Sequence, residues 1–223
     1  MPKPIPWSYT SLDDFVNCPR AYYEKRVAKS VVEAKSPQME WGEIVHKHFE
    51  NRQKDGTALP PELARHERYM AELAALPGQG FTEERIALSK TLTPCGFFDR
   101  SVWFRGVIDY RKVNRQHATL VDYKTGKVHQ KYKQLKLFAL HTFIDLPDVH
   151  TIDAKYYWTT TQQATGERYT REMIPFLWSQ FTPDLRQYVE AFRTDTWQPR
   201  PSGLCHGWCP VTSCEHWRPK KSR

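Results

Sequence analysis

The sequence predicts an α/β protein, because segments with the two-residue period of strands are interspersed with segments that have the periodicity of amphipathic helices. Strand patterns cover residues 82–90, 103–124 and 152–160. Helix patterns cover residues 38–51, 130–144 and 178–192. At 223 residues the chain is long enough for one well-buried domain and short for two. We therefore expect a single domain over residues 1–223.

The chain is basic, with 33 Lys and Arg residues against 25 Asp and Glu residues and a formal net charge of +8. This balance favours a polyanionic partner, nucleic acid first and a membrane surface second. Aromatic and basic residues are interleaved in Tyr22–Arg26 and Trp208–Arg218, which suits base stacking beside phosphate contacts. Arg20 and Tyr23 are candidate contacts of this kind. The alternative is that most of these aromatics belong to the core.

The first 15 residues contain no apolar run, so we expect neither a signal peptide nor a membrane-spanning segment. The expected location is the reducing cytoplasm, in a bacterium or encoded by a phage. In that setting the five cysteines suit metal or cluster ligation better than disulfides. Cys205, Cys209 and Cys214 lie close together among Gly and Pro residues. A fourth ligand could come from Cys18, His206 or His216.

Two short helices are expected near the N-terminus. Thr10–Asp13 carries start signals of the capping type, and the first helix should end near Asn17. Pro19 can open the next helix, over residues 20–27. Cys18 falls at the junction, where an isolated cysteine is more often a buried thiol.

Residues 38–51 form an amphipathic helix pattern. Its apolar stripe contains Trp41, Ile44, Val45, His48 and Phe49. His48 lies inside the stripe and is interpreted as a structural histidine. His46 lies on its border, next to Gly42, which would let a strand or ligand approach closely.

The segment Trp103–Lys127 predicts a β-hairpin with chemistry on it. Trp103, Arg105, Val107 and Asp109 should share one face, as should Leu120, Asp122 and Lys124. If the chain reverses between Asn114 and His117, Asp109 lies opposite Asp122, with Cβ atoms roughly 4.5–5.5 Å apart. Paired carboxylates repel unless a divalent cation is bound. The alternative is a solvated hairpin with an ordinary Asp/Lys pair.

The remaining segments carry weaker signals. Residues 60–76 predict a surface helix, 168–174 a further strand, and 178–192 the final helix. Glu84 shares a strand face with Ile86 and Leu88, and an ordinary edge-strand glutamate is the favoured interpretation. Cys95 matches no ligand spacing and is interpreted as the odd thiol. The 130–144 helix is basic in its first half, which suits a phosphate backbone.

Gly106–Asp109 and Val121–Gly126 resemble motifs II and III of the PD-(D/E)XK nuclease superfamily. The likeness is greatest to its RecB-like branch, which includes the CRISPR-associated RecB-like exonucleases. Trp41–His46 resembles motif I. The resemblance implies that His46, Asp109, Asp122 and the backbone carbonyl of Tyr123 bind one or two Mg²⁺ or Mn²⁺ ions. It also implies that Lys124 orients the attacking water.

Two further segments resemble this family. Gln134–Ala139 is similar to its Gln-x-x-x-Tyr motif with Phe138 in place of Tyr, which implies contacts of Gln134, Phe138 and the nearby Lys127 with DNA. The segment around Cys18 resembles that of cluster-containing members. Cys18, Cys205, Cys209 and Cys214 would then hold a [4Fe–4S] cluster, although four thiolates also suit zinc. Residues 1–30 and 195–223 would together form the cysteine cluster region.

The resemblance implies a restriction-endonuclease-like core with a mixed central sheet flanked by helices. It implies a metal-dependent deoxyribonuclease, an exonuclease on DNA ends or single strands, in recombination, repair or phage DNA processing. The alternative is a non-catalytic nucleic-acid-binding module with vestigial carboxylates and a structural zinc or iron–sulfur site. A redox protein is a more remote hypothesis. The expected partner is DNA, with no membrane; protein partners are not specified.

Overall fold

The computed structural model describes residues 5–220, and they fall into two compact units. The sheet unit is Ser36–Gln180, and the terminal unit combines Met1–Lys35 with Phe181–Arg223. The single domain expected over the whole length stays a prediction. None of the described helices is long and apolar enough to cross a bilayer.

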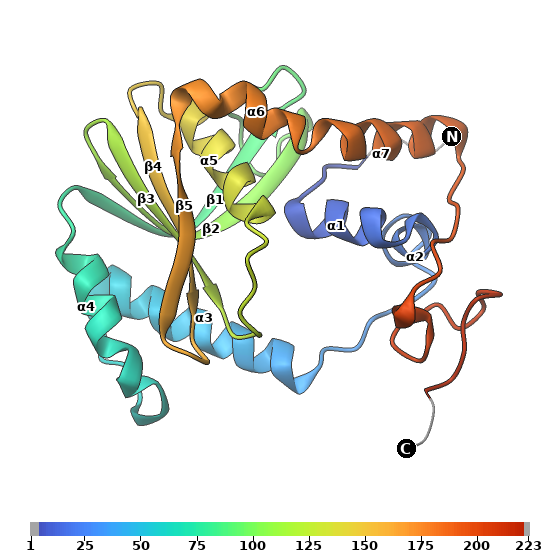
Figure 1. Ribbon diagram of the computed structural model, residues 1–223, viewed down its shortest axis with the longest axis horizontal. Helices are drawn as coiled ribbons and strands as arrows, with labels where there is room; N and C mark the ends of the chain where they lie inside the picture. Colours follow the sequence, from blue (N-terminus) through green and yellow to red (C-terminus); the bar gives the residue numbers. More distant parts are fainter. Residues whose placement is uncertain (1–4, 221–223) are drawn as a thin grey trace. The chain divides into compact units, whose positions relative to one another are not determined.

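The sheet unit contains a mixed five-stranded sheet, as expected (Figure 1). Its strands are β1 (Gln79–Ser89), β2 (Val102–Asn114), β3 (His117–Lys124), β4 (Thr151–Trp158) and β5 (Gln163–Thr170), in that spatial order. The β3–β4 pair is parallel and the other three pairs are antiparallel. The parallel pair needs a crossover, and a helix supplies it.

Helices cover both faces of this sheet. The elements are α3 (Pro37–Asp55), η2 (Pro61–His66), α4 (Glu67–Ala75), α5 (Lys133–Asp145), η3 (Arg171–Met173) and α6 (Ile174–Ser179). On one face, α3, η2 and α4 bury Val45, Phe49, Leu63, Met70 and Leu73 against Tyr110, Val121, Tyr123 and Tyr157. Helix α5, which is the β3–β4 crossover, covers the other face, where it reaches the sheet through Gln134 and Asp145.

The predicted apolar stripe of α3 is only partly buried. Val45 and Phe49 are fully buried, but Trp41 is 41% exposed and Ile44 is 47% exposed. His48 is half-buried rather than a core residue. Periodicity shows which residues share a helix face, but it does not show how much of that face a neighbour covers.

The central hairpin forms in the predicted register. Asn114 lies opposite His117, and Tyr110 opposite Val121, so the next position along the ladder is Asp109 with Asp122. Arg115 in the turn has a positive φ of 53°, which fits the tight reversal.

The predicted alternation of faces along β2 is interrupted near Asp109. A Cβ added at Gly106 would lie 3.2 Å from the Phe138 ring of α5. Tyr110 instead donates a hydrogen bond to the Leu73 carbonyl of α4, on the other face. Residues four apart in a regular strand share a face, but Gly106 and Tyr110 lie on opposite faces. Trp103, Arg105 and Val107 therefore do not share a face with Arg111, although the two-residue period predicts that they would.

The C-terminal elements differ from prediction in their boundaries. The last strand is β5, which ends at Thr170, so the strand expected over 168–174 is wrong beyond that point. The helix expected over 178–192 is two helices, α6 and α7 (Thr182–Thr194). Pro175 and Pro183 lie in their first turns, where proline is favoured because it lacks a donor that the helix would leave unpaired.

The terminal unit joins the two ends of the chain through an aromatic core. Its helical elements are α1 (Tyr9–Asn17), α2 (Pro19–Tyr22), the π-helical η1 (Tyr23–Val27), α7 and η4 (Gly203–Cys205). Ser8 caps α1 in a capping box with Ser11. Phe15, Tyr22, Tyr188, Phe192 and Trp197 pack at ring distances of 4.9–6.4 Å. The Tyr22 and Tyr188 hydroxyls are 2.8 Å apart.

Candidate functional site

Three potential metal ligands from three elements converge in the sheet unit. His46 comes from α3, Glu83 from β1 and Asp109 from β2, and one ligand atom of each lies within 4.8 Å of the others. His46 Nδ1 is 3.5 Å from Asp109 Oδ1 and 3.8 Å from Glu83 Oε1. Gly42 lies one turn before His46, and a Cβ there would be 3.4 Å from Thr125 Oγ1. The helix therefore passes close to the end of β3, as its sequence suggested.

The backbone of Tyr123 holds two of these side chains in place. Its N–H donates to Asp109 Oδ2 at 2.7 Å. His46 Nε2 lies 3.0 Å from its carbonyl oxygen; because a carbonyl can only accept, this nitrogen is the donor. The other imidazole nitrogen, Nδ1, is thereby turned toward the carboxylates of Glu83 and Asp109.

The electrostatics of this group favour a cation. Burial by itself would lower the pKa of His46, but the neighbouring carboxylates of Asp109 and Glu83 outweigh it and raise the pKa to about 10. Without a metal the imidazole therefore carries a proton at neutral pH, a positive charge set between two negative ones, and a cation binding at Nδ1 would displace this proton. Imidazole, carboxylate and carbonyl donors together suit Mn²⁺, and the oxygen donors suit Mg²⁺.

Glu83 was not predicted as a site residue. Its φ is +46°, a left-handed conformation that costs a non-glycine residue about 1–2 kcal/mol. The β1–β2 pairing runs from Thr82 with Tyr110 to Glu84 with Ile108 and passes over Glu83 and Asp109. This irregularity lies where the face alternation of β2 changes. The only sequence signal was two consecutive glutamates opposite a candidate metal-binding aspartate.

Glu84, the acid considered from the sequence, does something else. It pairs with the guanidinium of Arg111, which is buried and also bonds Asp145 of α5 at 3.1 Å. Burial raises the pKa of Glu84 against the opposing effect of Arg111. This glutamate ties the edge strand to α5, in agreement with its interpretation as a structural residue.

Asp122 and Lys124 lie at the end of β3 on the α5 side. Asp122 is 3% exposed and forms an ion pair with Lys124. Burial, reinforced by the charge of Asp109 and opposed by Lys124, raises the pKa of Asp122 to about 6. Asp109 is therefore close enough to raise the pKa of Asp122, although Asp122 is not one of the three residues whose ligand atoms cluster within 4.8 Å.

Lys124 is held from three directions. Besides Asp122, its Nζ donates to Gln134 Oε1 at 2.9 Å and lies 5.2 Å from the centre of the Tyr156 ring. The contact of Gln134 with DNA expected from the resemblance stays a prediction. Phe138, expected to stack on a base, is 3% exposed and packs over Gly106, so its ring is not accessible for stacking. Lys127 is exposed.

The two candidate nucleic-acid contacts of the terminal unit are both engaged in local interactions. Arg20 forms an ion pair with Glu24 at 2.7 Å. Tyr23 is half-buried, with its ring 5.1 Å from that of Trp197. Arg20 also lines the pocket that contains the cysteines.

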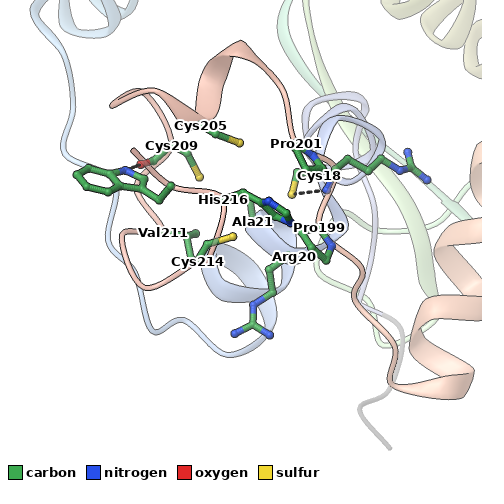
Figure 2. Close-up of a pocket in the computed structure, with 12 residues that line it drawn as sticks. Cys18, Arg20, Ala21, Pro199, Pro201, Cys205, Cys209, Val211, Cys214 and His216 are labelled. Atoms are coloured by element: carbon green, nitrogen blue, oxygen red, sulfur yellow. Dashed lines mark hydrogen bonds between the residues drawn. The ribbon is translucent and has the colours of Figure 1, made fainter. Parts of the chain in front are cut away.

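Four cysteines line one pocket of the terminal unit, together with Arg20, His216 and Trp217. Cys18, Cys205, Cys209 and Cys214 are all free thiols, and Figure 2 shows their sulfur atoms around a common space. Backbone N–H groups of Arg200 and Ser202 lie 3.4 and 3.5 Å from Cys18 Sγ and Cys205 Sγ. Burial raises the pKa of Cys209, and the three other thiols add to the effect. Cys95 belongs to the sheet unit.

Comparison with known proteins found one family model and similar solved structures. Residues 6–94, which include His46 and Glu83, match the family model of the PD-(D/E)XK nuclease superfamily. A solved structure from Eubacterium rectale, named "Putative exonuclease", is similar at 12% identity and a TM-score of 0.56, over 98% of this chain and 90% of that one.

A second structure, SSO0001, aligns at 16% identity over 96% of this chain and 88% of that one, with a TM-score of 0.49. No protein of curated function matches the sequence. The first likeness concerns the fold alone, and the mixed sheet flanked by helices is consistent with a restriction-endonuclease-like core.

Proposed function

We propose that this protein is a metal-dependent deoxyribonuclease of the PD-(D/E)XK superfamily. The observation that carries the proposal is the convergence of His46, Glu83 and Asp109 beside the Asp122–Lys124 pair. The match of the family model to residues 6–94 supports it. The net charge of +8 suits a polyanionic substrate.

In this proposal the chain's own groups have distinct tasks. His46, Glu83 and Asp109, with Asp122 and the carbonyl of Tyr123, would hold Mg²⁺ or Mn²⁺. When bound, the cation supplies activation of a water molecule and stabilisation of the charge that develops on the phosphate. Phosphodiester hydrolysis is so slow in water that such help is needed.

Lys124 orients the attacking water and lies close to the developing negative charge. Its ammonium is held by Gln134 and by the Tyr156 ring, so fewer of its rotamers are accessible and less order must be created at the moment of reaction. Gln134 is therefore a positioning residue in this scheme, and the DNA contact inferred for it from the resemblance stays a prediction.

Action on DNA ends or single strands is the finer part of the proposal. It rests on the resemblance to RecB-like exonucleases and on the name of the similar Eubacterium rectale protein. A role in recombination, repair or phage DNA processing in a bacterial or phage-infected cytoplasm follows from the same resemblance. Product sizing on linear, end-blocked and circular DNA tests the mode of attack.

For the terminal unit we propose a [4Fe–4S] cluster on Cys18, Cys205, Cys209 and Cys214, with Zn²⁺ as the alternative. The shared pocket and the N–H groups directed at two sulfurs support a thiolate site. Iron and zinc analysis with an absorption spectrum of anaerobically purified protein distinguishes the two. Cys18→Ser should lower the metal content, and an unchanged content would remove Cys18 from the ligand set.

The central test is degradation of labelled DNA with Mg²⁺ or Mn²⁺ and with EDTA. Wild type should degrade DNA only with the metal, and Asp109→Asn and Asp122→Asn should not. Glu72→Gln is the matched control, because Glu72 is an exposed carboxylate of α4 whose side chain is 62% accessible. Salt-sensitive DNA binding without metal-dependent cleavage in the wild type would favour the non-catalytic binding module instead.

A further inference from the structure

The loop between β1 and β2 presents two adjacent aromatic rings. Phe98 is 76% exposed, and Phe97 is half-buried beside it with ring centres 5.1 Å apart. A large apolar side chain this exposed is informative when other groups are organised around it. Here the surrounding groups are arginines.

Two guanidinium groups lie against these rings. Arg85 of β1 is 5.6 Å from the centres of both Phe97 and Phe98, and Arg105 of β2 is 5.3 Å from that of Phe97. Ala87 lies opposite Arg105, so the two arginines are diagonal neighbours across the strands. Among residues 5–220, no carboxylate forms an ion pair with either guanidinium. We call Arg85, Phe97, Phe98 and Arg105 the aromatic–arginine patch.

The loop that carries the patch is tied internally. The Gly96 N–H donates to Asp99 Oδ2 at 2.7 Å, and the Asp99 N–H donates to the Gly96 carbonyl at 3.0 Å. A Cβ at Gly96 would lie 2.7 Å from Asp99 Oδ1. Leu88 and Pro94 form a β-bridge at the base of the loop. The one carboxylate of the loop thus holds the turn and forms no ion pair with Arg85 or Arg105.

The patch lies on the strands that also carry the proposed metal ligands. Ile86 and Gly106 face α5, since a Cβ at Gly106 would lie 3.2 Å from the Phe138 ring of α5 and 3.6 Å from Ile86. Their neighbours Arg85 and Arg105 therefore project from the face away from α5. Four residue steps along β2 lead from Asp109 to Arg105, a path of about 13 Å, so a strand of a few nucleotides could reach from one to the other.

We propose that the aromatic–arginine patch binds a single-stranded segment of nucleic acid next to the nucleotides at the metal site. Phe98 offers a ring face on which a base stacks, and the arginines contact the phosphates on either side. A single strand exposes its base faces, whereas a duplex hides them. The unpaired positive charge favours this polyanion over a protein surface or a second copy of the chain. That the bound strand continues to the metal site rests on the proposed nuclease function; the binding itself does not.

The test is fluorescence anisotropy of a labelled thymidine 20-mer, in EDTA so that the measurement does not depend on cleavage. The full chain is compared with Phe98→Ala, Phe98→Trp and the double variant Arg85→Gln/Arg105→Gln. Phe176→Ala is the control, since Phe176 is an exposed phenylalanine of α6 that is 52% accessible and outside the patch. Circular dichroism melting of each variant establishes that it is folded.

Phe98→Ala should weaken binding of the single strand by at least about fivefold, with a smaller loss for blunt duplex. Phe98→Trp should restore the affinity, and the double arginine variant should also reduce the salt dependence of binding. Unchanged affinity of folded Phe98→Ala would overturn the proposal even if the wild type cleaves DNA. A loss of affinity in a protein that never cleaves DNA would support the patch and reject the nuclease. A sedimentation coefficient of Phe98→Ala that differs from that of the wild type, with unchanged DNA affinity, would overturn the proposal and assign the patch to self-association.

Discussion

Replacing Glu83 separates the metal-binding role of its side chain from the conformation of its backbone. Glu83 has a φ of +46° in the interior of β1, where a residue with a Cβ costs about 1–2 kcal/mol. In an ordinary strand, glycine is less stable than alanine by roughly 0.5–1 kcal/mol. At position 83 the two effects oppose each other, and the backbone term is the larger. The free energy of unfolding of Glu83→Gly should therefore be about 0.5–1 kcal/mol larger than that of Glu83→Ala.

Urea denaturation of both variants measures this difference, with Lys155 as the control position. Lys155 is exposed in the interior of β4, so Lys155→Gly should be less stable than Lys155→Ala. Both Glu83 variants lack the carboxylate, so neither should cleave DNA with Mn²⁺, and the rise in melting temperature that Mn²⁺ gives the wild type should be smaller in both. Alanine more stable than glycine at position 83, as at 155, would refute the strained backbone. Full Mn²⁺ stabilisation of both variants would refute Glu83 as a ligand.

Three further predictions concern single side chains. Lys124→Ala should abolish cleavage and leave DNA binding nearly intact; a large fall in affinity, measured by anisotropy, would assign Lys124 to phosphate binding. His46→Ala should weaken Mn²⁺ binding, so that activity needs a higher Mn²⁺ concentration. Replacing His48, which is half-buried, by Ala should mainly lower the melting temperature. The opposite pattern would contradict the site. Burial of His66, aided by Arg65, lowers its pKa to about 4, so the folded state excludes a proton that the unfolded state takes up near pH 6.5. His66 therefore imposes no penalty on the free energy of unfolding above pH 6.5, and this free energy falls by up to about 3 kcal/mol as the pH drops toward 4. A titration midpoint of the His66 imidazole near 6.5, measured by NMR, would contradict this prediction.

Local pattern was sufficient for the central hairpin. The turn between Asn114 and His117 and the two-residue period of the strands bring Asp109 level with Asp122, and Lys124 follows two residues later. His46 could be preferred over His48 because of its place at the border of the helical stripe beside Gly42. These features depend on residues close in the chain, whose relative placement the backbone geometry of one element or one tight turn determines.

Contacts between distant segments decided the rest. Phe138 is buried because Gly106 leaves room for its ring, and nothing in the helix pattern distinguishes a buried ring from one available for stacking. Gln134 contacts Lys124 because the helix it opens packs on the strand that lysine ends. The pocket of four cysteines forms in a unit that the aromatic rings of both chain ends hold together.

The sequence by itself determined the α/β class and the hairpin register, which depend on spacing along the chain, and its resemblance to a nuclease family pointed to His46, Asp109, Asp122 and Lys124 as candidates. Tertiary structure decided that Glu83 joins them. Its carboxylate reaches the site through a left-handed residue inside a strand and an irregularity in the β1–β2 ladder. Such a conformation is unfavourable locally and exists because the surrounding packing imposes it, so no local pattern could have revealed it.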